Sequence, residues 1–239
     1  NVIPPLMATR AVFYREIVAG LYTEAAYHVA GALCELPFII FSSTLFMVIY
    51  YFLIGFTASR FGYFFLANLL FTLWSVFIGQ TICAFAPNMT IALNVPPLIN
   101  TLGNVLAGFL ILRSAIPPWY IWIYWINPFQ YYNSGIITNQ MADQVFVCTE
   151  NEYVQFQLPT NATDCASLNN GDIPYFQYQD APTPGYCEYC PVTNGNVLLE
   201  AYGVGGFSKW INIAALAGFC VFFRVMALIG LIYSKHLDR

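Results

Sequence analysis

The composition of this 239-residue chain excludes an ordinary water-soluble fold, because 59% of its residues are hydrophobic, 18% are aromatic and only 8% are charged. A soluble domain carries roughly 25% charged residues. The formal net charge of −4 also excludes the basic surface that binds nucleic acid. We therefore expect an integral membrane protein, with the lipid bilayer and no nucleic acid among its partners.

The first segment, 1–35, precedes any long apolar run and opens on Asn1 rather than Met. We expect it to be the cytosolic connecting region of a longer polypeptide. Within it Phe13, Ile17 and Leu21 recur every four residues, which is typical of an amphipathic helix on the inner membrane surface. Such a helix is either a passive interfacial anchor or a contact for a cytosolic partner.

Four runs are long and apolar enough to cross a membrane, which takes about 20 residues. We predict transmembrane helices at 36–56, 61–85, 90–112 and 207–234. Four spans place both ends of the chain on the same side, so the tail 235–239 lies with the first segment.

The third predicted span is polar for a helix that faces lipid. Asn94, Pro97, Thr101 and Asn104 recur at helical spacing. Polar side chains at this depth turn toward protein or toward a water-filled path, and the pattern does not decide between helix packing and a substrate cavity.

Two ionisable residues, Glu35 and Arg224, lie inside apolar runs. If the first helix begins near Tyr27, Glu35 lies about two turns into it, and Arg224 lies nine residues before Tyr233. At 1.5 Å per residue, each is then about 12 to 14 Å from the cytosolic end of its helix. Because an unpaired charge at this depth is costly, we predict that the two form a buried ion pair. The alternative is that Arg224 extends its side chain to the cytosolic headgroups.

The segment 116–142 is rich in Trp and Tyr and contains a run too short to cross, flanked by prolines. Amphipathic rings prefer the headgroup level, so we predict a re-entrant or in-plane helix at the outer interface.

The connection 143–206 is acidic, contains no Lys or Arg, and carries four cysteines and the sequon at Asn161. Glycosylation and disulfides are both extracellular chemistry, so we expect this loop outside and the termini in the cytosol. It has no His, which argues against a zinc site. We predict disulfides among Cys148, Cys165, Cys187 and Cys190, with three connectivities open.

No catalytic constellation and no metal site stand out. The two histidines, His28 and His236, lie at opposite ends of the chain, and neither lysine, Lys209 or Lys235, belongs to a phosphate-binding loop. We therefore expect no cofactor in this segment and whatever energy source the protein uses to lie elsewhere.

The order of motifs resembles the membrane domain of ABC transporters of the G subfamily, including the pleiotropic drug resistance type. The resemblance covers nearly the whole chain. The motifs are Arg10-x-x-Phe13-Tyr14-Arg15-Glu16, Gly20-Leu21-Tyr22, Glu35-Leu36-Pro37 and Asn127-Pro128-Phe129-Gln130-Tyr131. It implies an all-α integral membrane fold with four transmembrane helices, an interfacial coupling helix, a re-entrant aromatic segment and a disulfide-bearing external loop.

The resemblance also implies a function, namely ATP-driven export of hydrophobic or amphipathic molecules such as drugs, lipids or sterols. ATP and Mg would bind a nucleotide-binding domain outside this segment. A second membrane half, from a homodimer or the same chain, would complete the domain, and we expect the plasma membrane. The alternative is a receptor or structural subunit that acts through its external loop.

By the same resemblance, Arg15 and Glu16 would couple nucleotide-driven closure to the spans. Thr101 and Asn104, with Pro97 and Asn94, would face transported molecules. The resemblance also implies that Phe109 and Leu110 form an apolar plug and that Asn161 carries a glycan. The long loop with four cysteines and Arg224 in the last span depart from the family pattern.

Overall fold

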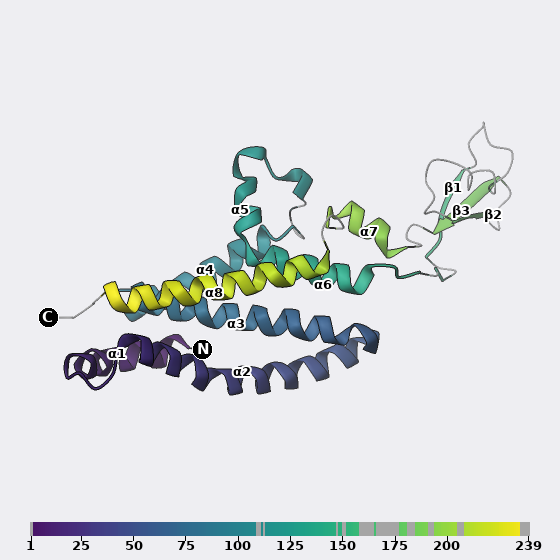
Figure 1. The fold of residues 1–239 in the computed structure, drawn as a ribbon. Coiled ribbons are helices and arrows are strands. Elements are labelled where there is room, and N and C mark those ends of the chain that lie inside the picture. The colour runs from purple at the N-terminus through teal and green to yellow at the C-terminus, as the bar shows by residue number, and fades with distance from the viewer. Residues whose placement is uncertain are drawn as a thin grey trace. The chain divides into compact units, whose positions relative to one another are not determined.

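The computed structural model (Figure 1) describes residues 2–108, 111, 113–146, 148–149, 152–157, 165, 177–180, 185–190, 194–204 and 208–234. By contacts the chain divides into two compact units. The first comprises Asn1–Asn139 with Phe207–Arg239, and the second is Gln140–Gly206.

The first unit is helical. Its helices are α1 (Ile3–Val18), α2 (Glu24–Ile54), α3 (Phe61–Phe85), α4 (Met89–Val105), α5 (Ile121–Ile126), α6 (Pro128–Met141, which ends in the second unit) and α8 (Lys209–Tyr233). Short 3₁₀ turns occupy Ala58–Arg60, Arg113–Ala115 and Pro118–Tyr120. The helices α2, α3 and α8 lie side by side along their length (Figure 1).

Three helices are long and apolar enough to cross a membrane, namely α2, α3 with its preceding turn, and α8. This result is consistent with an integral membrane protein, and the three helices cover most of three of the four predicted spans. Helix α4 has 17 residues, or about 25 Å at 1.5 Å per residue. The span predicted at 90–112 is therefore shorter in the structure, and a fourth crossing stays a prediction.

The first span begins earlier than predicted, at Glu24 rather than 36. Thr23 caps the helix, since its hydroxyl accepts a hydrogen bond from the backbone N–H of Ala26 at 3.3 Å. Pro37 lies inside the helix without ending it. Gly55, with φ of +80°, ends it in the left-handed conformation that favours glycine.

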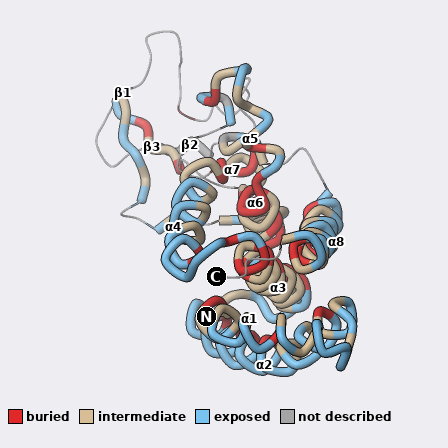
Figure 2. Tube along the Cα trace, turned by 90° about the vertical axis from the view of Figure 1, so that its left-hand side faces the viewer, coloured by how far each residue is buried: buried red, intermediate tan, exposed pale blue. Residues whose placement is uncertain are grey.

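The core of the first unit lies where α3, α6 and α8 meet (Figure 2). Trp74, Phe129 and Cys220 are buried there, and Phe71 stacks on Tyr132 with ring centroids 4.2 Å apart. Much of α2 is exposed, including large apolar side chains. Such a surface is suited to lipid or to further transmembrane helices.

The aromatic segment folds as α5 and α6, of 6 and 14 residues, and neither reaches the length of a span. Asn127 separates the two helices. Its side-chain oxygen accepts from the backbone N–H of Phe129, and its amide donates to the carbonyl of Gly103 at 2.7 Å. The break between the helices is thereby fixed to α4.

The second unit contains a small antiparallel sheet of β1 (Val154–Gln157), β2 (Gln177–Asp180) and β3 (Tyr186–Cys190), followed by α7 (Gly195–Ala201). The strand order is β1-β3-β2. The mostly helical prediction is confirmed, but an all-α description omits this sheet. Its strands are only 4 or 5 residues long, too short for a clear alternation of apolar and polar residues, and the cysteine count did not reveal a strand.

Candidate functional site

The polar residues of α4 lie on a face that no other part of the described chain covers. Asn94, Pro97, Thr101 and Asn104 are all exposed. The Asn104 amide donates to the backbone carbonyl of Asn100 at 2.8 Å, within the same helix. The helix therefore needs no other element of this chain to satisfy that donor, and its polar face is open.

Helix α4 also borders two cavities of the first unit. One, of about 450 Å³, is lined by Pro96, Pro97 and Asn100 together with Trp74. The other, of about 670 Å³, lies among α3, α4, the aromatic segment and α8, and its lining includes seven aromatic residues. Of the four predicted cavity residues, only Pro97 lines either space.

Sequence reasoning named Phe129 only as part of a family motif and gave it no cavity role, but its side chain lines both cavities. Its ring packs against Gly103, and a Cβ added to that glycine would lie 2.5 Å from the ring. Alternation of small and large side chains on neighbouring helices could have suggested this contact. The predicted plug residues, Phe109 and Leu110, lie outside the described residues.

The predicted coupling residues lie near the end of α1. Arg15 is exposed, and Glu16 accepts a hydrogen bond from the Tyr22 hydroxyl at 2.6 Å. This bond, chiefly, raises the pKa of Tyr22 to about 12. Phe13 is buried against Tyr27, with ring centroids 4.4 Å apart. These contacts hold the turn after α1 against the start of α2.

Helix α1 is also attached to the ends of two spans. Arg10 donates to the carbonyls of Ala86 and Pro87, at 2.6 and 2.8 Å, just after the last turn of α3. The Tyr14 hydroxyl donates to the carbonyl of Ser234 after α8, at 3.2 Å. A displacement of α1 would therefore pull on α3 and α8 as well as on α2.

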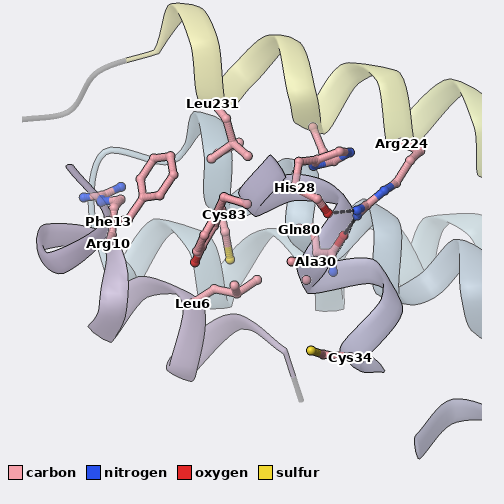
Figure 3. A pocket seen from close by; sticks show the side chains of 14 residues that line it. Leu6, Arg10, Phe13, His28, Ala30, Cys34, Gln80, Cys83, Arg224 and Leu231 are labelled. Atoms are coloured by element: carbon pink, nitrogen blue, oxygen red, sulfur yellow. Dashed lines mark hydrogen bonds between the residues drawn. The ribbon is translucent and has the colours of Figure 1, made fainter. Parts of the chain in front are cut away.

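Glu35 and Arg224 are joined through a third residue, Gln80, whose contact with Arg224 is drawn in Figure 3. The Gln80 amide donates to Glu35 at 2.8 Å, and its oxygen accepts from Arg224. Arg224 also donates to the backbone carbonyl of His28 and lies over the Phe77 ring. Among the described residues no direct ion pair joins the two charges. The polar network links α2, α3 and α8.

A second polar network joins the other ends of these helices. Arg60 donates to the carbonyl of Asn139 at 2.9 Å, and the Asn139 amide donates to the carbonyl of Arg60 at 3.0 Å. Lys209 donates to the side-chain oxygen of Asn139, which is buried. Asn139 thus connects the beginnings of α3 and α8 to α6.

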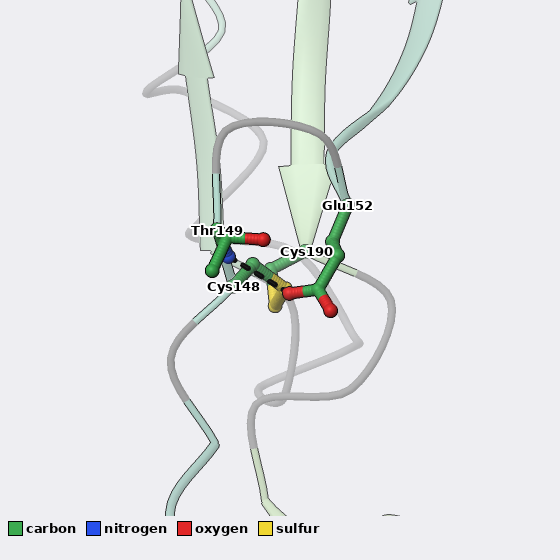
Figure 4. The surroundings of a disulfide bond; sticks show 4 residues. All are labelled: Cys148, Thr149, Glu152 and Cys190. Atoms are coloured by element: carbon green, nitrogen blue, oxygen red, sulfur yellow. Dashed lines mark hydrogen bonds between the residues drawn. A yellow bond between two sulfur atoms is a disulfide. The ribbon is translucent and has the colours of Figure 1, made fainter.

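The predicted cysteines form two disulfides, Cys148–Cys190 and Cys165–Cys187. Both attach to β3, and Figure 4 shows the first. Beside it, Glu152 accepts from the backbone N–H of Thr149 at 2.8 Å, which lowers the pKa of the Glu152 carboxyl. The predicted glycan site, Asn161, lies outside the described residues.

No cluster of three His, Cys, Asp or Glu side chains suited to a metal occurs among the described residues. The candidate site therefore consists of an open polar helix face, apolar cavities behind it and polar contacts at the helix ends. These features define a helical membrane domain.

The chain belongs to the ABC-2 type transporter family of membrane domains, whose family model matches residues 1–141. Two similar curated proteins come from Aspergillus. ABC multidrug transporter I of Aspergillus fumigatus is 31% identical over 224 residues, which is 90% of this chain and 15% of that protein. ABC multidrug transporter atrF of Aspergillus flavus is 30% identical over 220 residues, or 88% of this chain and 14% of that protein.

The G subfamily is represented among the relatives by ABC transporter G family member 11 of Dictyostelium discoideum. It is 27% identical over 254 residues, which covers 100% of this chain and 17% of that protein. The chain thus spans about one sixth of the length of the relatives that it matches. The predicted resemblance to G-subfamily ABC transporters is confirmed.

Proposed function

We propose that this chain is the membrane-domain part of an ATP-driven exporter of hydrophobic or amphipathic molecules. Membership in the ABC-2 family supports this proposal, as do relatives that carry the name multidrug transporter. The observation that carries it is the open polar face of α4, since polar residues inside a membrane turn toward protein or a water-filled path.

In this proposal Asn94, Pro97, Thr101 and Asn104 line one side of the substrate path. A second membrane half, from another copy or from the same polypeptide, supplies the other side. A path with few polar groups among apolar side chains accepts ligands that differ in shape, which suits drugs, lipids or sterols. Phe109 and Leu110 form the plug at the outer end of the path.

ATP and Mg bind a nucleotide-binding domain outside this segment, and Arg15 and Glu16 receive its motion. The contacts of Arg10 and Tyr14 support this role for α1, because they attach the helix to the ends of α3 and α8. Export also requires that the inward and outward states differ in affinity for the substrate, since equal binding shifts no equilibrium.

The second unit supports an orientation for the chain in the membrane. Its two disulfides form in an oxidising compartment, which favours an extracellular position for 143–206, a glycan at Asn161 and cytosolic termini. The plasma membrane is the location that fits an exporter with these features.

The substitution Asn104→Leu tests the substrate path. In the full-length native polypeptide, reconstituted in vesicles, we expect a changed range of transported dyes and altered drug stimulation of ATP hydrolysis, with an unchanged unfolding temperature. Thr101→Val and Thr90→Val form a matched pair, because Thr90 lies at the cytosolic start of the same helix. Unaltered transport of every compound in both Asn104→Leu and Thr101→Val would contradict the assignment.

A further inference from the structure

A third cavity, distinct from the two behind α4, lies among α1, α2, α3 and α8 (Figure 3). Its volume is about 320 Å³, at the lower end of the range of roughly 300–1,000 Å³ for ligand sites. The surface is largely apolar, with Leu6, Phe13, Cys83 and Leu231 among its lining residues. The substrate path proposed above does not use this space.

Two arginines face this cavity from different elements. Arg10 lies on α1, beside the carbonyls that follow α3, and Arg224 lies nine residues before the end of α8. At 1.5 Å per residue, Arg224 therefore lies about 14 Å from the end of α8, toward the middle of that helix. The cavity therefore extends from the helix ends into the apolar part of the membrane domain.

The positive charge of Arg10, at the end of the cavity nearest the helix ends, is not neutralised by a carboxylate of the described residues. Arg10 donates to two backbone carbonyls, and the described part of the chain provides no carboxylate partner for it. No Asp or Glu appears among the described residues that line the cavity. A guanidinium has five donors, so Arg10 can bind a further acceptor while it keeps both carbonyls.

An apolar cavity with a cation at the membrane boundary matches an amphiphile with an anionic head. Basic pockets between transmembrane helices on the cytoplasmic side bind acidic lipid headgroups. We propose that the cavity binds an anionic phospholipid, with its phosphate beside Arg10 and one acyl chain along Gly31 and Cys34. The inner leaflet is its source in the orientation proposed above, and export itself is not required.

The bound lipid would contact the helix that carries the coupling residues. Its headgroup would lie on α1 and its acyl chain between α2 and α8, so it would fill the space across which α1 moves relative to these spans. A bound lipid would thereby change how strongly a displacement of α1 is transmitted to α8. The lipid composition of the membrane would then influence the coupling of nucleotide-driven closure to the spans.

The test uses the full-length native polypeptide in nanodiscs of phosphatidylcholine with or without phosphatidylserine. Both leaflets of a nanodisc contain both lipids, so the result does not depend on orientation. A phosphatidylserine with a photoreactive acyl chain is cross-linked, and mass spectrometry locates the label. We expect labelling of the peptide that contains Gly31 and Cys34, and weaker labelling with the corresponding phosphatidylcholine.

Two variants probe the two halves of the site. Arg10→Gln should reduce phosphatidylserine labelling about fivefold, since a membrane-surface cation contributes about 1 kcal/mol. Gly31→Leu should abolish the labelling by filling the cavity, because a Cβ at Gly31 meets no atom within 4 Å and the helix can keep its form. The second variant therefore tests the site even if the first fails to fold.

The matched controls are Arg15→Gln, the same change at an exposed arginine of α1, and Gly218→Leu, the same change at an open glycine of α8 outside the cavity. Both should keep the wild-type labelling of the Gly31 peptide. Equal labelling by the two lipids in the wild type, or labelling that persists in Gly31→Leu, would overturn the proposal. Transport in the wild type is a separate measurement, so failure of the lipid site and failure of export are distinguishable.

Discussion

Gln80 shows how one neutral side chain can hold two charges inside a membrane domain. Its amide has a donor for Glu35 and an acceptor for Arg224, so each charge is hydrogen-bonded without direct contact between them. The sequence indicated the two charges because they interrupt apolar runs. It could not indicate Gln80, since an isolated glutamine in an apolar helix gives no sign of its partners.

Replacement of Gln80 by Leu should destabilise the first unit by about 1–3 kcal/mol, because both charges lose a hydrogen bond in a place that water reaches poorly. Thermal unfolding of the purified protein in detergent measures the loss. Ser75→Ala, on the same helix, is the control, since this hydroxyl donates only to the carbonyl of Phe71 in its own helix. An unfolding temperature equal to that of Ser75→Ala would show that the network does not stabilise the fold.

Tyr22 provides a pH-dependent contact outside the spans. Its pKa is raised from 10.0 to about 12, so the folded state favours the protonated phenol. The stabilisation is therefore complete below pH 10 and is lost as the pH rises through about 12. Tyr22→Phe should be less stable than the wild type by a constant amount from neutral pH to pH 10. The difference should shrink above that, and a difference that grows with pH instead would contradict the assigned bond.

At the scale of elements, the joint between α4 and the aromatic segment is a close contact. Gly103 lies under the Phe129 ring and accepts a hydrogen bond from Asn127. Gly103→Ala should force the ring aside and cost about 1–3 kcal/mol, the usual range for an overpacked core. Gly218→Ala, where the added Cβ meets nothing, should be neutral or slightly stabilising. Thermal unfolding of both variants makes the comparison, and equal stability would mean that the joint accommodates the methyl group.

The sequence predicted which long apolar helices the chain forms more accurately than it predicted the residues at which they begin and end. Hydrophobic length identified α2, α3 and α8, because a membrane span needs a long charge-free run. The early start of α2 at Glu24 depends on the cap at Thr23, and the short extent of α4 depends on a turn near Gly108, where φ is +85°. Both are local features that apolar length does not record.

The residues of the candidate site could be predicted from the sequence only in part. Helical spacing placed Asn94, Thr101 and Asn104 on one face, and the structure leaves that face open. The contacts of Arg10 with Ala86 and Pro87 could not be predicted, because they join residues more than 70 positions apart. Pairing of the cysteines was also open, since four cysteines in one loop permit three patterns.

At the scale of the whole molecule, the two units should respond separately to reduction. Each disulfide closes a loop, with separations of 42 and 22 residues, and a loop of this length contributes about 3–4 kcal/mol. Dithiothreitol should therefore accelerate hydrogen exchange in β1 and β3 and leave α3 and α8 unchanged. An alkylating reagent without reductant is the control. Faster exchange throughout α3 and α8 would show instead that the spans depend on the external unit.

The nesting of the two disulfides has a consequence for proteolysis of the second unit. The bond between Cys165 and Cys187 lies within the loop closed by Cys148 and Cys190, and both bonds end on β3. A protease that cuts once between Cys165 and Cys187 leaves its two products covalently joined. A nicked molecule would run as a single band without reductant and as two with it, so cleavage there would not by itself separate the helices before the loop from α8.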